Sequence, residues 1–294
     1  MQGLSILIPV YRDSCVAQVV ALHRQCQPLA MPWEIVVADD GSPSPCDEIN
    51  DEIGSMPCCR LIKRQENVGR AAIRNFLARE ARFDTLLYID AGMMPFDGFI
   101  ATYVKNIGKA DVVVGSLRVA KGSVDLSNLR CKNEMRAERR HSVSKSNEQP
   151  YKNFHSGNFM ISRSVVLDNP FREDIKTYGY EDTLFGKALA DRHVSIIHID
   201  NPLLFVRFES NERFLEKTRE AMLTLYAYRE ELKGYSALLH LVDGLQRCHL
   251  LWITVWINQL ITTAIRRNLM GGNPSLFLYN VFRVCCLSDN YMKS

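Results

Sequence analysis

Acidic residues stand at the ends of short apolar runs in the first ninety residues of the chain. Asp39 and Asp40 follow one such run, and Asp90 follows another. Apolar runs that alternate with helical patterns are typical of buried parallel strands, whose carboxyl ends meet at one edge of a sheet. Carboxylates there can accept hydrogen bonds from a nucleobase or from ribose hydroxyls. The pattern therefore indicates a nucleotide-binding edge built from side chains.

Two further run ends carry aromatic, amide and basic residues. The first run leads into Pro9-Val10-Tyr11-Arg12-Asp13, and a weaker third run leads to Glu66-Asn67-Val68-Gly69-Arg70. Proline and aromatic faces can stack on a base, and basic groups bind phosphates. Neither G-x-G-x-x-G after a strand nor G-x-x-x-x-G-K-[ST] occurs in the sequence. A Rossmann dehydrogenase and a P-loop ATPase are thereby disfavoured, and a nucleotide would be held by side chains at strand ends.

The elements that must position these residues follow from the spacing of apolar side chains. Strands are expected over residues 4–10, 34–38, 60–63, 85–89, 111–114, 159–161 and 194–199. Helical spacing follows Val68 and Pro95, and returns from Tyr180 to Asp191. This alternation predicts an α/β fold with a mostly parallel central sheet and flanking helices. From Asn211 onward the pattern is mostly helical.

Composition limits the class of protein. The 294 residues carry a net charge of +3, with 47% hydrophobic and 23% charged residues, which excludes disorder, collagen and coiled coil and does not demand nucleic acid. Nine cysteines show no CxxC spacing, so we expect reduced thiols. Because the first residues lack a basic leader, we also expect a cytoplasmic location.

Two segments depart from the alternation. The polar stretch from Lys121 to Gln149 is expected to be an insertion or a mobile flap, whose basic residues either clamp the phosphate of a lipid-linked acceptor or form a solvated loop. The apolar stretch from Leu250 to Ile265 is short for a membrane span. It is expected to be either a core helix or a helix lying at a membrane surface.

Four ordered motifs resemble those of family 2 glycosyltransferases: residues 5–11, 36–42, 66–75 and Tyr180-Glu181-Asp182. The resemblance covers about residues 3–205, and the tail is similar to that of bacterial members serving surface-polysaccharide assembly. It implies a GT-A fold, inversion at the anomeric carbon, a nucleoside-diphosphate sugar donor (a UDP-sugar by default) and a glycan or lipid-linked acceptor. Residues 1–115 would form the nucleotide-sugar-binding half, 116–210 the acceptor-binding and catalytic half, and 211–294 a C-terminal helical subdomain.

The resemblance also assigns roles in donor binding. Pro9, Tyr11 and Arg12 would line the nucleobase pocket, and Asp39 or Asp40 would accept from the base. Asn67, Gly69 and Arg70 would lie near the ribose and diphosphate at a helix N-terminus, which favours anions. The implied donor set is Pro9, Tyr11, Arg12, Asp39, Asp40, Gly41, Ser42, Asn67, Gly69, Arg70, Arg74 and Asp90.

Catalysis would rest on an acid at the start of a helix. Asp182 would take the proton of the acceptor hydroxyl as general base, and Glu181 would orient sugar hydroxyls. Acids at a helix start also cap the helix, which is the alternative for this pair. His155, Asn158 and Tyr180 would contact the acceptor.

One family motif is incomplete. Asp90 matches the first acid of a D-x-D motif, but the third position is Gly92, which offers no side-chain ligand to Mn²⁺ or Mg²⁺. His198 either substitutes as a metal ligand or is a buried strand residue. A divalent metal would therefore be held poorly.

Two hypotheses follow from this gap, and a third comes from the shared sheet architecture. Arg70, Arg74, Arg207 or a lysine of residues 121–149 would neutralise the leaving diphosphate in place of the metal, or the chain would be a catalytically silent GT-A scaffold that serves a partner. A nucleotidyltransferase is the third hypothesis. It is disfavoured because no glycine-rich turn follows the first apolar run.

Overall fold

The computed structural model describes residues 2–292, and among these the side chains of all residues except 255 and 257–262. The chain forms two compact units. The first contains Met1–Ser123, Glu138–Lys176 and Phe185–Arg207, and the second contains Val124–Ala137, Thr177–Leu184 and Phe208–Ser294.

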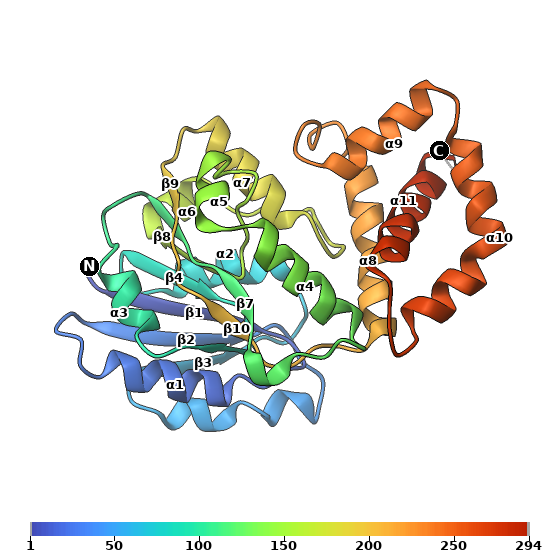
Figure 1. Cartoon of the computed structure of the whole chain (residues 1–294). Coiled ribbons are helices and arrows are strands. Elements are labelled where there is room, and N and C mark those ends of the chain that lie inside the picture. The colour runs from blue at the N-terminus through green and yellow to red at the C-terminus, as the bar shows by residue number, and fades with distance from the viewer. Residues whose placement is uncertain (1, 293–294) are drawn as a thin grey trace. The chain divides into compact units, whose positions relative to one another are not determined.

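The main sheet of the first unit has seven strands (Figure 1). They are β1 (Leu4–Val10), β2 (Trp33–Asp39), β3 (Cys59–Lys63), β4 (Thr85–Ile89), β6 (Val112–Val114), β8 (Asn158–Ser162) and β9 (Ile196–His198). Their order is β3-β2-β1-β4-β8-β6-β9, with β8 antiparallel to both of its neighbours and the other pairs parallel. The expected α/β fold with a mostly parallel sheet is confirmed, and each expected strand is present.

Helices cover both faces of this sheet. The first face packs against α1 (Val16–Cys26) and α3 (Phe99–Val104), and the second packs against α2 (Arg70–Glu80), α6 (Arg163–Asp168) and the later part of α7 (Glu181–Asp191). Strands covered on both faces read as continuous apolar runs, which is why the sequence pattern predicted them. Helix α1 was not among the predicted elements.

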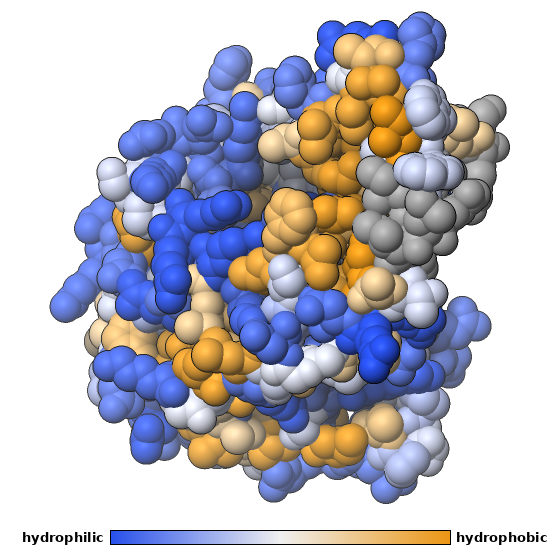
Figure 2. All heavy atoms as spheres, turned by 45° about the vertical axis from the view of Figure 1, so that its right-hand side comes forward, coloured by the Kyte–Doolittle hydropathy of each residue, from blue (hydrophilic) through white to orange (hydrophobic). Residues whose placement is uncertain are grey.

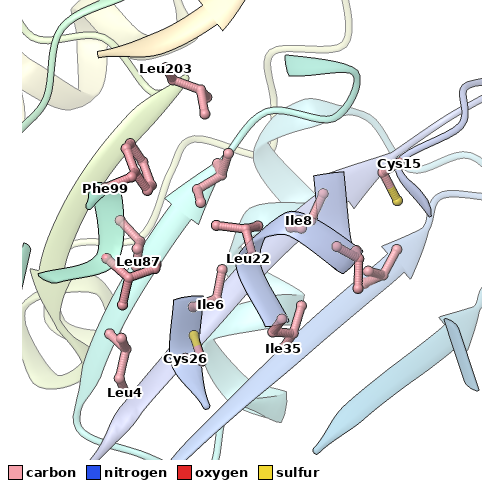
Figure 3. Packing of buried hydrophobic residues seen from close by; sticks show 14 of the residues in the cluster. Leu4, Ile6, Ile8, Cys15, Leu22, Cys26, Ile35, Leu87, Phe99 and Leu203 are labelled. Carbon is pink, nitrogen blue, oxygen red and sulfur yellow. The ribbon is translucent and has the colours of Figure 1, made fainter. Parts of the chain in front are cut away.

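Alternation along β1 divides its side chains between two hydrophobic cores. Ile6 and Ile8 lie in the core beneath α1, together with Leu22 and Cys26 of that helix (Figure 3). Leu7 lies in the core on the opposite face. All five residues are fully buried, so β1 is held from both sides and its carboxyl end is fixed in place.

A second, three-stranded sheet was not predicted. It consists of β5 (Met93–Pro95), β7 (Leu117–Val119) and β10 (Leu203–Phe205), in the order β5-β10-β7. Strand β10 runs antiparallel to β5, with Phe205 opposite Met93. This register brings the residues after Phe205 to the turn that precedes Met93.

The segment 121–149, expected to be an insertion or a mobile flap, contains helices. After a 3₁₀ turn (Lys121–Ser123) the chain forms α4 (Leu129–Arg140) and α5 (Val143–Glu148). Arg130 pairs with Glu134 one turn along α4 at 3.3 Å and with Glu209 at 2.9 Å. The mixed charges thus favour a helix through pairing at i, i+4. Two further 3₁₀ turns, Cys46–Glu48 and Asp51–Ser55, lie between β2 and β3.

The second unit is helical beyond Phe208. Its helices are α8 (Asn211–Ala227), α9 (Ala237–Arg247), α10 (Leu251–Leu269) and α11 (Leu276–Met292). Among the described residues, its core contains Leu129, Phe214, Leu215, Ile265, Leu269, Tyr279 and Phe282.

Helix α10 contributes to this core at its end and exposes side chains at its start. Trp252 and Trp256 are 59% and 56% exposed, and hydrophobic residues gather at the surface among these helices (Figure 2). The side chains of 255 and 257–262, which bear on the choice between a core and a membrane-surface helix, lie outside the described ones. Among the described residues, no helix has the length and apolar character needed to cross a membrane.

Candidate active site

Hydrogen bonds tie together the carboxyl ends of β1 and β2. The backbone N–H of Asp40 donates to the Val10 carbonyl at 2.9 Å, and that of Ser42 donates to Asp39 Oδ1 at 2.9 Å. The Ser42 hydroxyl in turn accepts from the Arg12 N–H at 2.7 Å. These bonds bring the predicted residues of the first two strand ends into one connected edge.

Gly41 lets the third strand end approach this edge. Its φ is +73°, and a Cβ built on it would lie 2.5 Å from the Glu66 carbonyl carbon and 2.7 Å from the Asn67 nitrogen. A side chain at this position would therefore collide with backbone. Glycine permits both the left-handed conformation and the close approach.

Asp40 holds the start of α2. Its two oxygens accept from the N–H groups of Val68 at 3.1 Å and Gly69 at 2.9 Å. Burial raises the pKa of Asp40, and these two donors partly offset the shift. Asp39 and Asp40 are both buried, so these contacts position the loop, and acceptance from a nucleobase stays a prediction.

Exposed side chains surround the buried carboxylates of Asp39 and Asp40. Tyr11 is 42% exposed, and the Arg12 guanidinium lies 5.0 Å from the centre of its ring. Asn67 is exposed and Pro9 is half-buried. The edge therefore presents an aromatic face, a cation and an amide to solvent, which are groups that suit a nucleotide.

Asp90, directly after β4, lies between two arginines of α2. Arg74 Nη2 donates to Asp90 Oδ1 at 2.7 Å, and Arg70 Nη2 donates to Oδ2 at 3.2 Å. Burial alone would raise the pKa of Asp90, but Arg74 and Arg70 outweigh it and hold that pKa below its ordinary value. The carboxylate is therefore ionised and engaged on both oxygens.

Gln18 of α1 holds the turn that follows Asp90. Its side-chain amide donates to the Asp90 carbonyl at 2.9 Å and accepts from the Gly92 N–H at 3.2 Å. The residue is buried. Sequence reasoning missed Gln18, and a polar residue on the buried face of an otherwise apolar helix is the signal that points to it.

Gly92 faces an ion pair. A Cβ at Gly92 would lie 2.7 Å from Asp13 Oδ2 and 3.0 Å from Arg207 Nη2. Arg207 pairs with Asp13 and donates to the Ser14 carbonyl at 2.9 Å. Arg207 was among the expected cations, whereas no role was expected for Asp13. The β5–β10 register accounts for the meeting, because Arg207 follows Phe205 by two residues.

Asn158 differs from its expected acceptor-binding role. Its Oδ1 accepts from the Tyr103 hydroxyl at 2.7 Å, and its Nδ2 donates to the carbonyls of Ser116 and Asn201, each at 2.9 Å. The side chain is fully buried. Its contacts join β8 to neighbouring segments, so no atom of the amide is presented to a sugar.

His155 and His198, the two histidines with expected roles, are held by backbone carbonyls. His155 Nε2 bonds to the Gly115 carbonyl at 3.0 Å, and His198 Nε2 bonds to the Pro150 carbonyl at 3.0 Å. Burial lowers the pKa of His155 to about 4 and also lowers the pKa of His198. Both rings are therefore neutral at pH 7, with the Nε2 proton facing the carbonyl.

The expected catalytic residues belong to the second unit. Asp182 Oδ1 accepts from the Thr183 N–H at 2.7 Å and from its hydroxyl at 3.3 Å, at the start of α7. Glu181 is buried. Burial raises the pKa of Tyr180, whose hydroxyl bonds to Arg283 and Ser236. The carboxylate of Asp182 thus accepts hydrogen bonds from the next residue, Thr183, at the start of α7. Its role as the general base stays a prediction.

The residues around Asp90 offer few oxygens to a divalent metal. Mg²⁺ and Mn²⁺ favour several carboxylate or carbonyl oxygens. Asp90 offers two oxygens already bound by guanidinium groups, and Gly92 offers no side chain. Within residues 2–292, no three His, Cys, Asp or Glu side chains gather to hold a metal, so Asp90 and His198 form no such group.

Comparison with known proteins identifies the family. Residues 5–168 match the model of glycosyl transferase family 2. A chondroitin synthase of Escherichia coli is 30% identical over 118 residues, which cover 38% of this chain and 17% of that protein. A hyaluronan synthase of Pasteurella multocida is 23% identical over 277 residues, which cover 82% of this chain and 28% of that protein. The chain thus spans less than a third of either relative.

Solved structures share the fold. The mannosyltransferase PcManGT from Pyrobaculum calidifontis, in complex with GDP-Man and Mn²⁺, aligns with a TM-score of 0.63 at 15% identity, over 99% of this chain and 87% of that one. TarS from S. aureus aligns with a TM-score of 0.53 at 17% identity, over 76% and 40%. The mixed sheet and these structural neighbours show that the chain has the GT-A fold. Because the family model matches more than half of its residues, the chain belongs to glycosyl transferase family 2, a family of sugar-transferring enzymes.

Proposed function

We propose that the protein is an inverting glycosyltransferase that moves a sugar from a nucleoside-diphosphate sugar to a glycan or lipid-linked acceptor in polysaccharide synthesis. The observation that carries the proposal is the connected edge of Asp39, Asp40 and Asp90 with the arginines of α2. The relatives named as chondroitin and hyaluronan synthases support the polysaccharide part.

Donor binding would use the exposed groups of this edge. The ring of Tyr11 and the backbone around Arg12 would receive the base, and Asn67 would reach the ribose. Arg70 would contact the diphosphate at the start of α2, where the positive end of the helix dipole favours anions. One structural neighbour carries UDP and another carries GDP-Man, which supports a nucleotide-sugar donor. We expect the nucleotide of the donor to be UDP.

Transfer would proceed by direct displacement. Asp182 would accept the proton of the acceptor hydroxyl while the oxygen forms a bond to the anomeric carbon. The bond from that carbon to the diphosphate oxygen would break, and its electron pair would leave with the nucleoside diphosphate. Glu181 and Tyr180 would orient sugar hydroxyls, and His155, neutral at pH 7, would line the acceptor side.

The organisation of the chain follows from the same proposal. Residues 1–115 would bind the donor, residues 116–210 would bind the acceptor and carry the base, and residues 211–294 would form a helical subdomain. The acceptor would be met at the inner face of a membrane, as the resemblance to surface-polysaccharide members of the family implies.

The test is a turnover assay on Asp182→Asn. UDP-, GDP- and dTDP-sugars are supplied with an oligosaccharide acceptor mixture, and the released nucleoside diphosphate is measured. We expect at least a hundredfold loss of turnover with unchanged nucleotide binding by calorimetry, because general-base catalysis contributes roughly 10²–10⁴-fold. The matched control is Asp191→Asn. Asp191 lies at the other end of α7 and pairs with Lys187 at 2.7 Å. Full activity of Asp182→Asn would exclude it as the base.

A silent GT-A scaffold is the second candidate function. The specific observation in its favour is Gly92 in the family's acidic motif, with both oxygens of Asp90 bound by arginines. Calorimetry with UDP, GDP and dTDP separates the two candidates. A scaffold shows no heat with any of them, whereas a transferase binds at least one.

A further inference from the structure

The surroundings of Asp90 contain more positive than negative charge. Arg70 and Arg74 pair with Asp90, and two residues along the chain Gly92 faces a second ion pair, between Arg207 and Asp13. Because guanidinium groups stay protonated and both carboxylates are paired with cations, the five side chains leave one net positive charge. Such a cluster attracts a polyanion.

Gly92 makes room for one of these cations. A side chain at this position would collide with Asp13 Oδ2 at 2.7 Å and press on Arg207 Nη2 at 3.0 Å. The φ of +77° is also one that side chains rarely adopt. The place where a residue-92 carboxylate would begin is therefore occupied by the Asp13–Arg207 pair.

Arg207 is held but not enclosed. Asp13 and the Ser14 carbonyl accept from its Nη2, and the pairing of β10 with β5 fixes the backbone that leads to it. Its side chain remains 53% exposed. A planar guanidinium carries five N–H donors, and such a fork can bind two phosphate oxygens at once.

We infer that Arg207, seated over Gly92 by Asp13, binds the diphosphate of the donor and neutralises it as it leaves, so that the protein needs no divalent metal for this task. The inference rests on the proposed function and deepens it. Preorganised cations can stabilise a departing diphosphate without a metal. Arg207 would act together with Arg70, and Asp13 would act as a positioning residue through Arg207.

A competing arrangement uses the same residues differently. If Arg207 swung away, Asp13 and Asp90 could together offer carboxylate oxygens to a divalent ion held mainly by the diphosphate. The two arrangements predict opposite responses to chelator and to removal of the Asp13 charge, which decides between them.

The experiment is calorimetry on the full chain with UDP, GDP and dTDP, each in excess EDTA and in Mn²⁺. For the diphosphate that binds most tightly, we expect affinities in the two conditions to agree within about twofold. Arg207→Met should weaken its binding at least tenfold, and should change binding of the matching monophosphate much less. Arg207→Lys should recover part of the loss, because it keeps the charge but not the fork.

Arg24→Met, on α1 and paired only loosely with Asp97 at 3.8 Å, should leave binding unchanged. Asp13→Asn should retain binding in EDTA, because the amide oxygen still accepts from Arg207. The inference is overturned if binding requires Mn²⁺ and Asp13→Asn abolishes it, or if Arg207→Met binds like the wild type. No binding of any diphosphate by the wild type would instead refute the proposed function.

Discussion

Arg74 donates a hydrogen bond to Asp90 across 2.7 Å from a side chain that is only 1% exposed. An arginine cannot shed its charge when buried, so it needs an anionic partner inside the protein. Its own carbonyl accepts from the Tyr88 hydroxyl at 2.9 Å, which ties the same turn of α2 to β4. The pair therefore supports the fold as well as the candidate donor site.

Arg74→Met should destabilise the protein. Removing one partner of a buried ion pair costs roughly 3–5 kcal/mol, and we expect about 2 kcal/mol here because Asp90 is partly solvated and keeps Arg70. Urea unfolding measures the free energy. Arg79→Met on the exposed face of the same helix is the control, and a similar loss in both variants would contradict the assignment.

Gln18→Met should weaken binding of the nucleoside diphosphate. It removes both hydrogen bonds that hold the Asp90–Gly92 turn, and we expect a loss of about fivefold in affinity, or roughly 1 kcal/mol. Gln25 on the same helix likewise bonds to the Phe96 carbonyl and the Ile100 N–H. Gln25→Met should therefore cost similar stability in unfolding experiments without changing affinity. Equal affinities of the two variants would argue against a role for the turn.

Gly41→Ala should be costly. The substitution places a Cβ within 2.5 Å of backbone at a φ of +73°, and we expect a loss of more than about 2 kcal/mol in thermal or urea unfolding. Gly54→Ala provides the comparison, since a Cβ there meets nothing within 4 Å. If the two variants were equally stable, the close approach of the second and third strand ends would be wrong.

His155 should make stability depend on pH. Burial lowers its pKa from 6.5 to about 4, so between these values the unfolded chain binds a proton that the folded protein does not. Its contribution to stability is present above pH 6.5 and is lost as the pH falls toward 4. From pH 7 to pH 5, wild type should lose about 1–2 kcal/mol more than His155→Gln, as measured by urea unfolding at each pH. Parallel losses would show that the ring titrates normally.

The parts predicted well are those that depend on local pattern. Runs such as Leu4–Val10 and Thr85–Ile89 are apolar throughout because both faces of their strands are buried, so the strands and the position of their polar ends could be read directly. The helix that follows Gly69 was predicted because its apolar residues recur at helical spacing. Leu117–Val119 has a charged residue at its centre and is only half-buried, so it does not read as an apolar run and was missed.

Sequence alone determined that Asp39, Asp40, Asp90 and the arginines of α2 would share one edge, because parallel strands end on the same side of a sheet. Tertiary structure decided which of these groups are buried supports and which face solvent. It buried Asn158 and placed Arg207 over Gly92, because the pairing of Phe205 with Met93 joins segments that no local pattern relates. Side-chain type can be read along the chain, whereas the partner of each side chain depends on how distant segments pack.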